Sequence, residues 1–193
     1  MRNYCGHALP EGIAKNDKLP VPLLTPSTKD AVHDEPISGG EAVSSGRLTQ
    51  AQWDACAAYS HAVFAHGQKV AADRGLILVD TKYEFGTLPD GTIVMADELH
   101  TPDSSRYWVA DIYAARHAVG KEPENIDKEF LRLWFRKHCD PYKDKVLPEA
   151  PPDLVCELSR RYIMLYEMIT GAPFGFPDTS EAAICAAITR PAR

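Results

Sequence analysis

The sequence has few cysteines, no paired-cysteine motif and no excess of positive charge. Its five cysteines are odd in number and widely spaced, so neither a disulfide framework nor a zinc ribbon is expected. The net charge of −6 at pH 7 argues against a general binder of nucleic acids or anionic membranes, because both need a basic face. A local cluster of lysine and arginine side chains can still hold an anionic substrate.

Long apolar stretches are lacking as well. No apolar run approaches the length of a membrane span, and residues 1–7 have no apolar core of the kind that a signal peptide needs. Together with the cysteine pattern, this predicts a soluble protein of the cytoplasm. The chain has 193 residues, of which 45% are hydrophobic and 25% are charged. These values suit one folded core and argue against general disorder.

The pattern of residues divides the chain into three parts. A core domain rarely opens on a long loop, so residues 1–48 are expected to be a partly irregular segment with a binding role. Their turn-forming residues include Pro10, Pro20, Pro22, Pro26 and Pro36. Residues 49–175 carry the helix and strand patterns of a main domain. Residues 176–193 form a weakly patterned tail.

Helix boundaries are marked by capping signals. Thr49 and Gln52 form a capping box at the start of a helix predicted over residues 49–74, and Gly75 is a natural stop. A second helix is predicted to begin near residues 125–127. A third begins at residues 151–153, where proline suits the first turn, and ends at Gly171.

Residues 76–97 predict a β-hairpin, with strands over 76–86 and 92–97. Side chains alternate along a strand, so Asp80, Lys82 and Glu84 are expected on one face. Asp97 is then expected across from Lys82 or diagonal to Glu84. Two interpretations stay open. The patch is a solvated sheet face with cross-strand ion pairs, or it is a Mg²⁺ site, because this hard cation takes oxygen ligands and accompanies phosphates.

Two further polar segments have the composition of binding loops. Residues 97–106 combine acids with Ser104, Ser105 and Arg106, and arginine grips phosphate through two parallel hydrogen bonds. In residues 25–34, Lys29 is suited to an anion and Asp34 to an amine or a metal. The alternative for residues 25–34 is a plain polar loop with an aspartate-capped turn.

These motifs resemble the SAICAR synthetases, the phosphoribosylaminoimidazole-succinocarboxamide synthases. Residues 76–86 are similar to the first signature of that family, and residues 95–98 with 102–106 to the second. The segments that resemble its substrate loop and C-terminal helices are 19–29 with His33 and Asp34, 127–132, and 161–171. The resemblance implies an α+β fold, in which an antiparallel sheet of ATP-grasp-like character is flanked by long helices. Residues 49–175 would then be the catalytic domain.

The resemblance also implies a reaction and its ligands. ATP would phosphorylate the carboxylate of the imidazole ribotide CAIR, and the amine of L-aspartate would displace the phosphate to give SAICAR. No nucleic acid or membrane partner is implied, and a homo-oligomer is compatible with the sequence. The implied roles fall on residues of the three motifs: catalysis by Lys82 and Asp80, Mg²⁺ ligation by Glu84 and Asp97, and substrate binding by Arg106, Ser105, Asp103, Asp34, Lys29 and His33.

The chain departs from the family at its front. The glycine-rich hairpin whose lysines cover the ATP phosphates, and a later Arg-rich segment, have no counterpart here, and residues 1–7 resemble the middle of the family chain. The expectation is a fragment, an internal-start gene model or a truncated homologue. Two alternatives stay open beside the ligase. One is a non-catalytic interaction partner of a full-length enzyme. The other is a metal-dependent phosphohydrolase with a compact cluster of His33, Asp34, Asp97 and His100.

Overall fold

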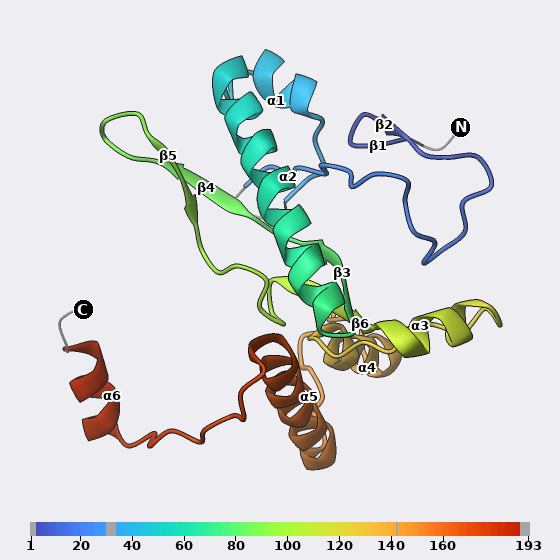
Figure 1. The fold of residues 1–193 in the computed structure, drawn as a ribbon, viewed down its shortest axis with the longest axis vertical. Helices are drawn as coiled ribbons and strands as arrows, with labels where there is room; N and C mark the ends of the chain where they lie inside the picture. Colours follow the sequence, from blue (N-terminus) through green and yellow to red (C-terminus); the bar gives the residue numbers. More distant parts are fainter. Residues whose placement is uncertain (1–2, 30–33, 142, 190–193) are drawn as a thin grey trace.

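The computed structural model describes residues 3–29, 34–141 and 143–189. Within these ranges the chain combines helices with short antiparallel strands, which confirms the α+β class (Figure 1). The elements in chain order are β1 (Asn3–Tyr4), β2 (His7–Ala8), α1 (Gly39–Ser44), α2 (Gln50–Asp73), β3 (Leu76–Thr81), β4 (Glu84–Thr87), β5 (Ile93–Ala96), β6 (Ser105–Val109), α3 (Ala110–His117), α4 (Glu129–His138), α5 (Pro152–Thr170) and α6 (Glu181–Ile188).

The strands form three two-stranded ladders, β1 with β2, β3 with β6, and β4 with β5. The continuous strand predicted over residues 76–86 is therefore wrong, because the chain leaves β3 after Thr81 and starts β4 at Glu84. The second half of the predicted hairpin is confirmed. Glu84 pairs with Ala96 across β4 and β5, and the turn closes with a hydrogen bond from Leu88 N to Thr92 O of 2.9 Å.

The core lies where α2 and α5 meet the β3–β6 ladder. Its buried side chains come from five parts of the chain: Ala71, Leu76, Leu78, Tyr107, Ile126 and Leu165. In Figure 1, α2 runs along β3, and α3, α4 and α5 gather at the lower end of the ladder. Leu76 and Leu78 lie on the same face of β3, and both are buried. This face of β3 therefore packs against the core, and the strand pairs with β6 inside the fold.

The predicted helix signals hold for α2 and α5. Thr49 and Gln52 form the capping box of α2, and Gly171 ends α5 in the left-handed conformation with φ 70°. The helix predicted from residues 125–127 starts later, at Glu129, because Asn125 is held in an extended bridge with Trp108. The tail contains α6, which stands apart from the body in Figure 1. None of the helices in the described ranges combines the length and the apolar character needed to cross a bilayer.

Gly67 in α2 is expected to resist replacement by alanine. Alanine favours a helix interior by about 1 kcal/mol over glycine. An added Cβ at Gly67, however, would lie 2.2 Å from His100 Cε1 and 2.9 Å from Leu78 Cδ2, and such overpacking costs about 1–3 kcal/mol. Because the contact of 2.2 Å with His100 places the overpacking cost in the upper part of this range, at about 2–3 kcal/mol, we expect Gly67→Ala to lower the free energy of unfolding in urea by about 1–2 kcal/mol.

The matched control for this change is Gly40→Ala in α1. A Cβ at Gly40 would meet nothing within 4 Å, so the substitution should leave stability unchanged or raise it slightly. If Gly67→Ala were as stable as the unchanged protein, the close packing of α2 on the loop that carries His100 would be refuted.

Candidate functional site

Four other predicted site residues act on or near Lys82, which lies just beyond the end of β3. Lys82 Nζ lies 2.7 Å from Glu84 Oε1, and Lys29 Nζ lies 2.5 Å from Glu84 Oε2. The charges of Asp34 and Asp97 also reach Lys82 and help to raise its pKa. Segments far apart in the sequence thus bring two ammonium groups and three carboxylates to one place, which we call the Lys82 cluster.

The two lysines fix the charge of Glu84. Hydrogen bonds from Lys29 and then from Lys82 lower the pKa of Glu84 to about 2, so its carboxylate is ionised at neutral pH. The hydrogen bond to Glu84 likewise raises the pKa of Lys82. The cluster therefore presents fixed charges of both signs, which is what a site needs if it stabilises charge that moves during a reaction.

The backbone after β5 is unusual. Asp97 and His100 have positive φ angles of 74° and 55°, a region that non-glycine residues seldom adopt. His100 is held there by two bonds: its Nε2 lies 2.5 Å from Tyr83 Oη, and its carbonyl oxygen accepts from Tyr107 Oη at 2.7 Å. Burial lowers the pKa of His100 and raises the pKa of Tyr83 to about 12. The loop held in this way also carries Asp97, whose charge helps to raise the pKa of Lys82.

The donor set suits Mg²⁺ only in part. In the described part of the chain, no group of three or more His, Cys, Asp or Glu side chains is arranged to hold a metal ion. Mg²⁺ commonly uses one or two protein carboxylates and completes its shell with water and substrate phosphates. Glu84 and Asp97 fit that pattern, provided that Glu84 exchanges a lysine contact for the ion.

The compact His/Asp cluster that a phosphohydrolase requires is not formed by the described residues. His100 is engaged with Tyr83, and His33 lies outside the described residues. The charges of Asp34 and Asp97 instead act on Lys82 and help to raise its pKa. The structure of the described residues thus disfavours this alternative.

Arg106 and Asp80 form a second unit, on the β3–β6 ladder. The two residues are register partners, and Arg106 Nε donates to Asp80 Oδ1 at 2.9 Å while Nη2 pairs with Oδ2. This hydrogen bond raises the pKa of Arg106. The prediction that Asp80 shares one strand face with Lys82 and Glu84 is wrong, because β3 ends before Lys82. Asp80 instead forms an ion pair with Arg106.

Ser105 and Asp103 do not join Arg106. Ser105 is buried, and its hydroxyl donates to Thr81 Oγ1 at 2.8 Å, on the face of the ladder opposite to Arg106. Asp103 lies 3.5 Å from Lys128 Nζ, at the start of α4. The predicted binding roles of both residues remain predictions. In the structure, the hydroxyl of Ser105 joins β6 to β3 through its hydrogen bond to Thr81.

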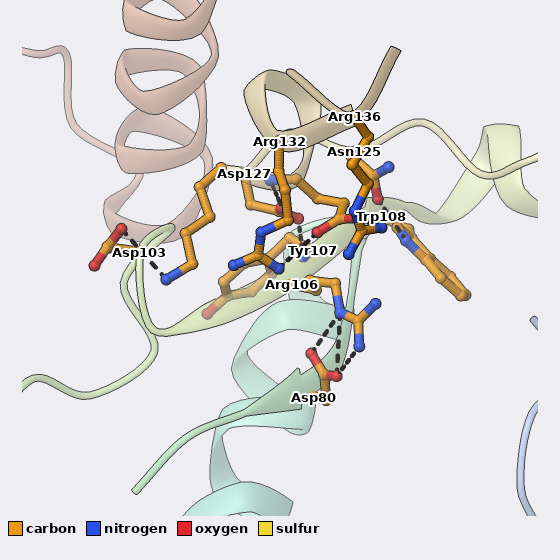
Figure 2. A network of polar contacts seen from close by, with 11 residues as sticks. Asp80, Asp103, Arg106, Tyr107, Trp108, Asn125, Asp127, Arg132 and Arg136 are labelled. Carbon is orange, nitrogen blue, oxygen red and sulfur yellow. Dashed lines mark hydrogen bonds and ion pairs between the residues drawn. The ribbon is translucent and has the colours of Figure 1, made fainter. Parts of the chain in front are cut away.

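A polar network around the start of α4 was not anticipated from the sequence (Figure 2). Asp127 is fully buried and accepts from Tyr107 N at 2.9 Å and from Glu129 N at 2.7 Å. Burial raises the pKa of Asp127. Glu129 accepts from Arg132 and Arg136. The available signal was the spacing of cations at positions 128, 132 and 136, which share one helix face.

Arg161 on α5 makes contacts with the segment before α4 and with α4 itself. Its guanidinium lies 4.0 Å from the centre of the Phe130 ring and donates to the carbonyl of Asn125. It therefore ties α5 to the segment before α4.

Comparisons with known proteins identify the family of the chain. A family model described as SAICAR synthetase matches residues 1–149. The phosphoribosylaminoimidazole-succinocarboxamide synthase of Legionella pneumophila (strain Lens) is 59% identical over 90% of this chain and 56% of its own length. The chloroplastic synthase of Arabidopsis thaliana is 56% identical over 94% of this chain and 44% of its own length.

Solved structures show the same similarity. The SAICAR synthase of Saccharomyces cerevisiae complexed with SAICAR superposes with a TM-score of 0.72 at 31% identity, over 89% of this chain and 54% of that one. A SAICAR synthetase (type 2) in complex with ADP gives a TM-score of 0.63 at 26% identity, over 85% and 57% of the two chains. The chain thus spans about half the length of the relatives that it matches.

Proposed function

Because the chain belongs to the SAICAR synthetase family, we propose that it takes part in the ATP-dependent ligation of L-aspartate to the carboxylate of CAIR, which yields SAICAR, ADP and phosphate. The observation that carries this proposal is the Lys82 cluster. It brings an ammonium group and acidic oxygens together from the two family signatures and from the segment that resembles the substrate loop. The proposed location is the cytoplasm.

The proposed reaction depends more on electrostatic stabilisation by the protein than on covalent catalysis. A carboxylate is a poor electrophile, so it must first become an acyl phosphate, and phosphoryl transfer depends on alignment and on neutralising charge. Lys82 would stabilise negative charge on the transferred group or at the acyl centre. Glu84 and Asp97 would hold Mg²⁺, which would neutralise phosphate charge when bound.

Substrate binding would use the groups around this centre. Arg106 would hold the 5′-phosphate of CAIR in exchange for Asp80, whose carboxylate is half-exposed and can be displaced. Lys29 would contact an anionic substrate group, and Asp34 would lie at the CAIR end of the site. Roles for Ser105, Asp103 and His33 in substrate binding, and for Asp80 in assisting Lys82, are part of the same proposal.

The test is an assay of SAICAR formation in two forms of the protein. We expect the isolated chain to bind Mg-ATP weakly or undetectably in calorimetry, because the glycine-rich hairpin of the family has no counterpart in its sequence. We expect a chimera to form SAICAR from ATP, CAIR and L-aspartate, if it supplies the part of the Legionella relative that this chain does not cover.

The outcomes separate the ligase from the non-catalytic homologue. A folded chimera without activity, next to an active relative, would favour the non-catalytic interaction partner. Micromolar affinity of the isolated chain for Mg-ATP would show that the described residues form the nucleotide site unaided.

A further inference from the structure

The loop after β5, residues 97–104, contains two strained backbone positions. Asp97 and His100 have positive φ angles of 74° and 55°, although neither is glycine. Such conformations persist only where the surrounding contacts hold them, and they gather at functional sites. One of the two residues, Asp97, is a proposed Mg²⁺ ligand. The contacts of the other, His100, show what holds the loop in place.

His100 is held from three sides. Its Nε2 lies 2.5 Å from Tyr83 Oη, and its carbonyl oxygen accepts from Tyr107 Oη at 2.7 Å. Its ring lies against the bare backbone of α2 at Gly67, where an added Cβ would be 2.2 Å from His100 Cε1. Burial disfavours charge on the ring and on the hydroxyl, so Tyr83 donates to a neutral imidazole. The side chain and the backbone of His100 are therefore both fixed.

Tyr83 lies between two residues of the Lys82 cluster. Lys82 and Glu84 contact each other, whereas the Tyr83 side chain between them extends to His100. A second bond joins the same two segments, because Lys82 N donates to Ser104 O at 3.1 Å. The short segment of residues 82–84 is thus joined to the loop after β5 at two points.

We infer that Tyr83 and His100 are positioning residues, whose hydrogen bond sets the place of Asp97 relative to Lys82 and Glu84. They act through Asp97 and not on the substrate. The inference rests on the proposed function, because the placement matters only if the cluster stabilises a transferred phosphoryl group. A misplacement of about 1 Å, caused by a change away from the reacting atoms, can lower a rate about 100-fold. A hydrogen bond outside the cluster can therefore control turnover.

The effect on the loop is tested in the isolated chain by ¹⁵N relaxation, which needs no turnover. The N–H groups of residues 97–99 should be rigid in the unchanged chain, with order parameters of about 0.85. Tyr83→Phe keeps the ring but removes the donor. His100→Asn suits the left-handed backbone but is too short to replace Nε2. Either change should lower the order parameters below about 0.6. Unchanged values in either variant, or a loop that is already flexible in the unchanged chain, would overturn the inference.

The effect on the reaction is tested in the chimera described above. Each single variant should lower kcat for SAICAR formation about tenfold and raise the Mg²⁺ concentration for half-maximal rate, because Asp97 is displaced. Partial unfolding would lower kcat alone. Since both changes break one bond, the double variant should lose no more than either single variant. Normal kcat in the single variants, or losses that multiply to about 100-fold in the double variant, would overturn the inference.

The matched control is Tyr113→Phe on α3. Tyr113 also donates from a half-buried hydroxyl to a loop, at Asn16 O with a distance of 2.7 Å. Its loss should leave kcat and the order parameters of residues 97–99 unchanged, and an equal effect would overturn the inference. If the chimera forms no SAICAR while the loop responds as expected, the positioning of Asp97 by Tyr83 and His100 is retained and the proposed function is rejected.

Discussion

Replacing Lys82 with alanine is expected to lower the rate of SAICAR formation by about 100-fold or more, the size of effect seen when a positioned charge-stabilising group is removed. Lys82 Nζ lies 2.7 Å from Glu84 and within reach of the charges of Asp34 and Asp97. Its loss removes the ammonium group at the centre of the Lys82 cluster. Lys29 remains on Glu84, but it approaches the opposite carboxylate oxygen and cannot occupy the same position.

The measurement is kcat for SAICAR formation in the chimera described above, with circular dichroism to confirm folding. The fold should survive, because the Lys82 side chain is 62% exposed. Lys69→Ala is the matched control: Lys69 is also an exposed lysine in an ion pair, with Asp73 on α2, and its loss should leave kcat unchanged. Near-normal turnover of Lys82→Ala would refute the central role of Lys82.

Local signals in the sequence were sufficient for several elements. The capping box of Thr49 and Gln52 places the start of α2, and Gly171 places the end of α5. The turn at residues 88–91 identifies the β4–β5 hairpin. Each of these signals depends on residues a few positions apart, whose conformational preferences act before any tertiary contact forms.

Pairings between distant segments were harder to predict. The separation of β3 from β4 depends on β6, which begins 24 residues after Thr81 and takes Asp80 and Thr81 as partners. The alternation of side chains along residues 76–86 does not show that β6 pairs with the first part of this segment while β5 pairs with the second. The sequence predicts that Lys82, Glu84 and Asp97 lie together because all three belong to neighbouring predicted strands, whereas the contact of Lys29 with Glu84 crosses 55 positions and follows from tertiary packing alone.

The polar network at the start of α4 could not be predicted from the sequence for a different reason. A buried acid such as Asp127 cannot be told from an exposed one by composition, because burial depends on which segments cover it. Its neighbours along the chain, Lys128 and Glu129, suggest a solvated helix start. In the fold, the same carboxylate joins the backbone of β6 to the first turn of α4. Asp127 thus sets the position of the helix that carries the arginines.

Asp127→Ala is therefore expected to lower the free energy of unfolding by about 3 kcal/mol. The change leaves the N–H groups of Tyr107 and Glu129 buried without their acceptor, and each such group costs about 1–3 kcal/mol. Relief from the burial of a charge offsets part of this loss. Burial raises the pKa of Asp127, so the native state binds this proton more tightly than the unfolded chain does.

The sign of the pH dependence follows from that shift. The contribution of Asp127 to stability falls as pH rises from the unfolded pKa of about 3.9 through the higher native value, and the alanine variant lacks this contribution. The difference between the two proteins should thus be larger below about pH 4 than at neutral pH. Urea unfolding at both pH values measures it, with Asp73→Ala, an exposed acid on α2, as the control. A loss that grows toward neutral pH would mean that Asp127 is stabilised as a charged partner of Arg106, and not as a buried acceptor for the backbone.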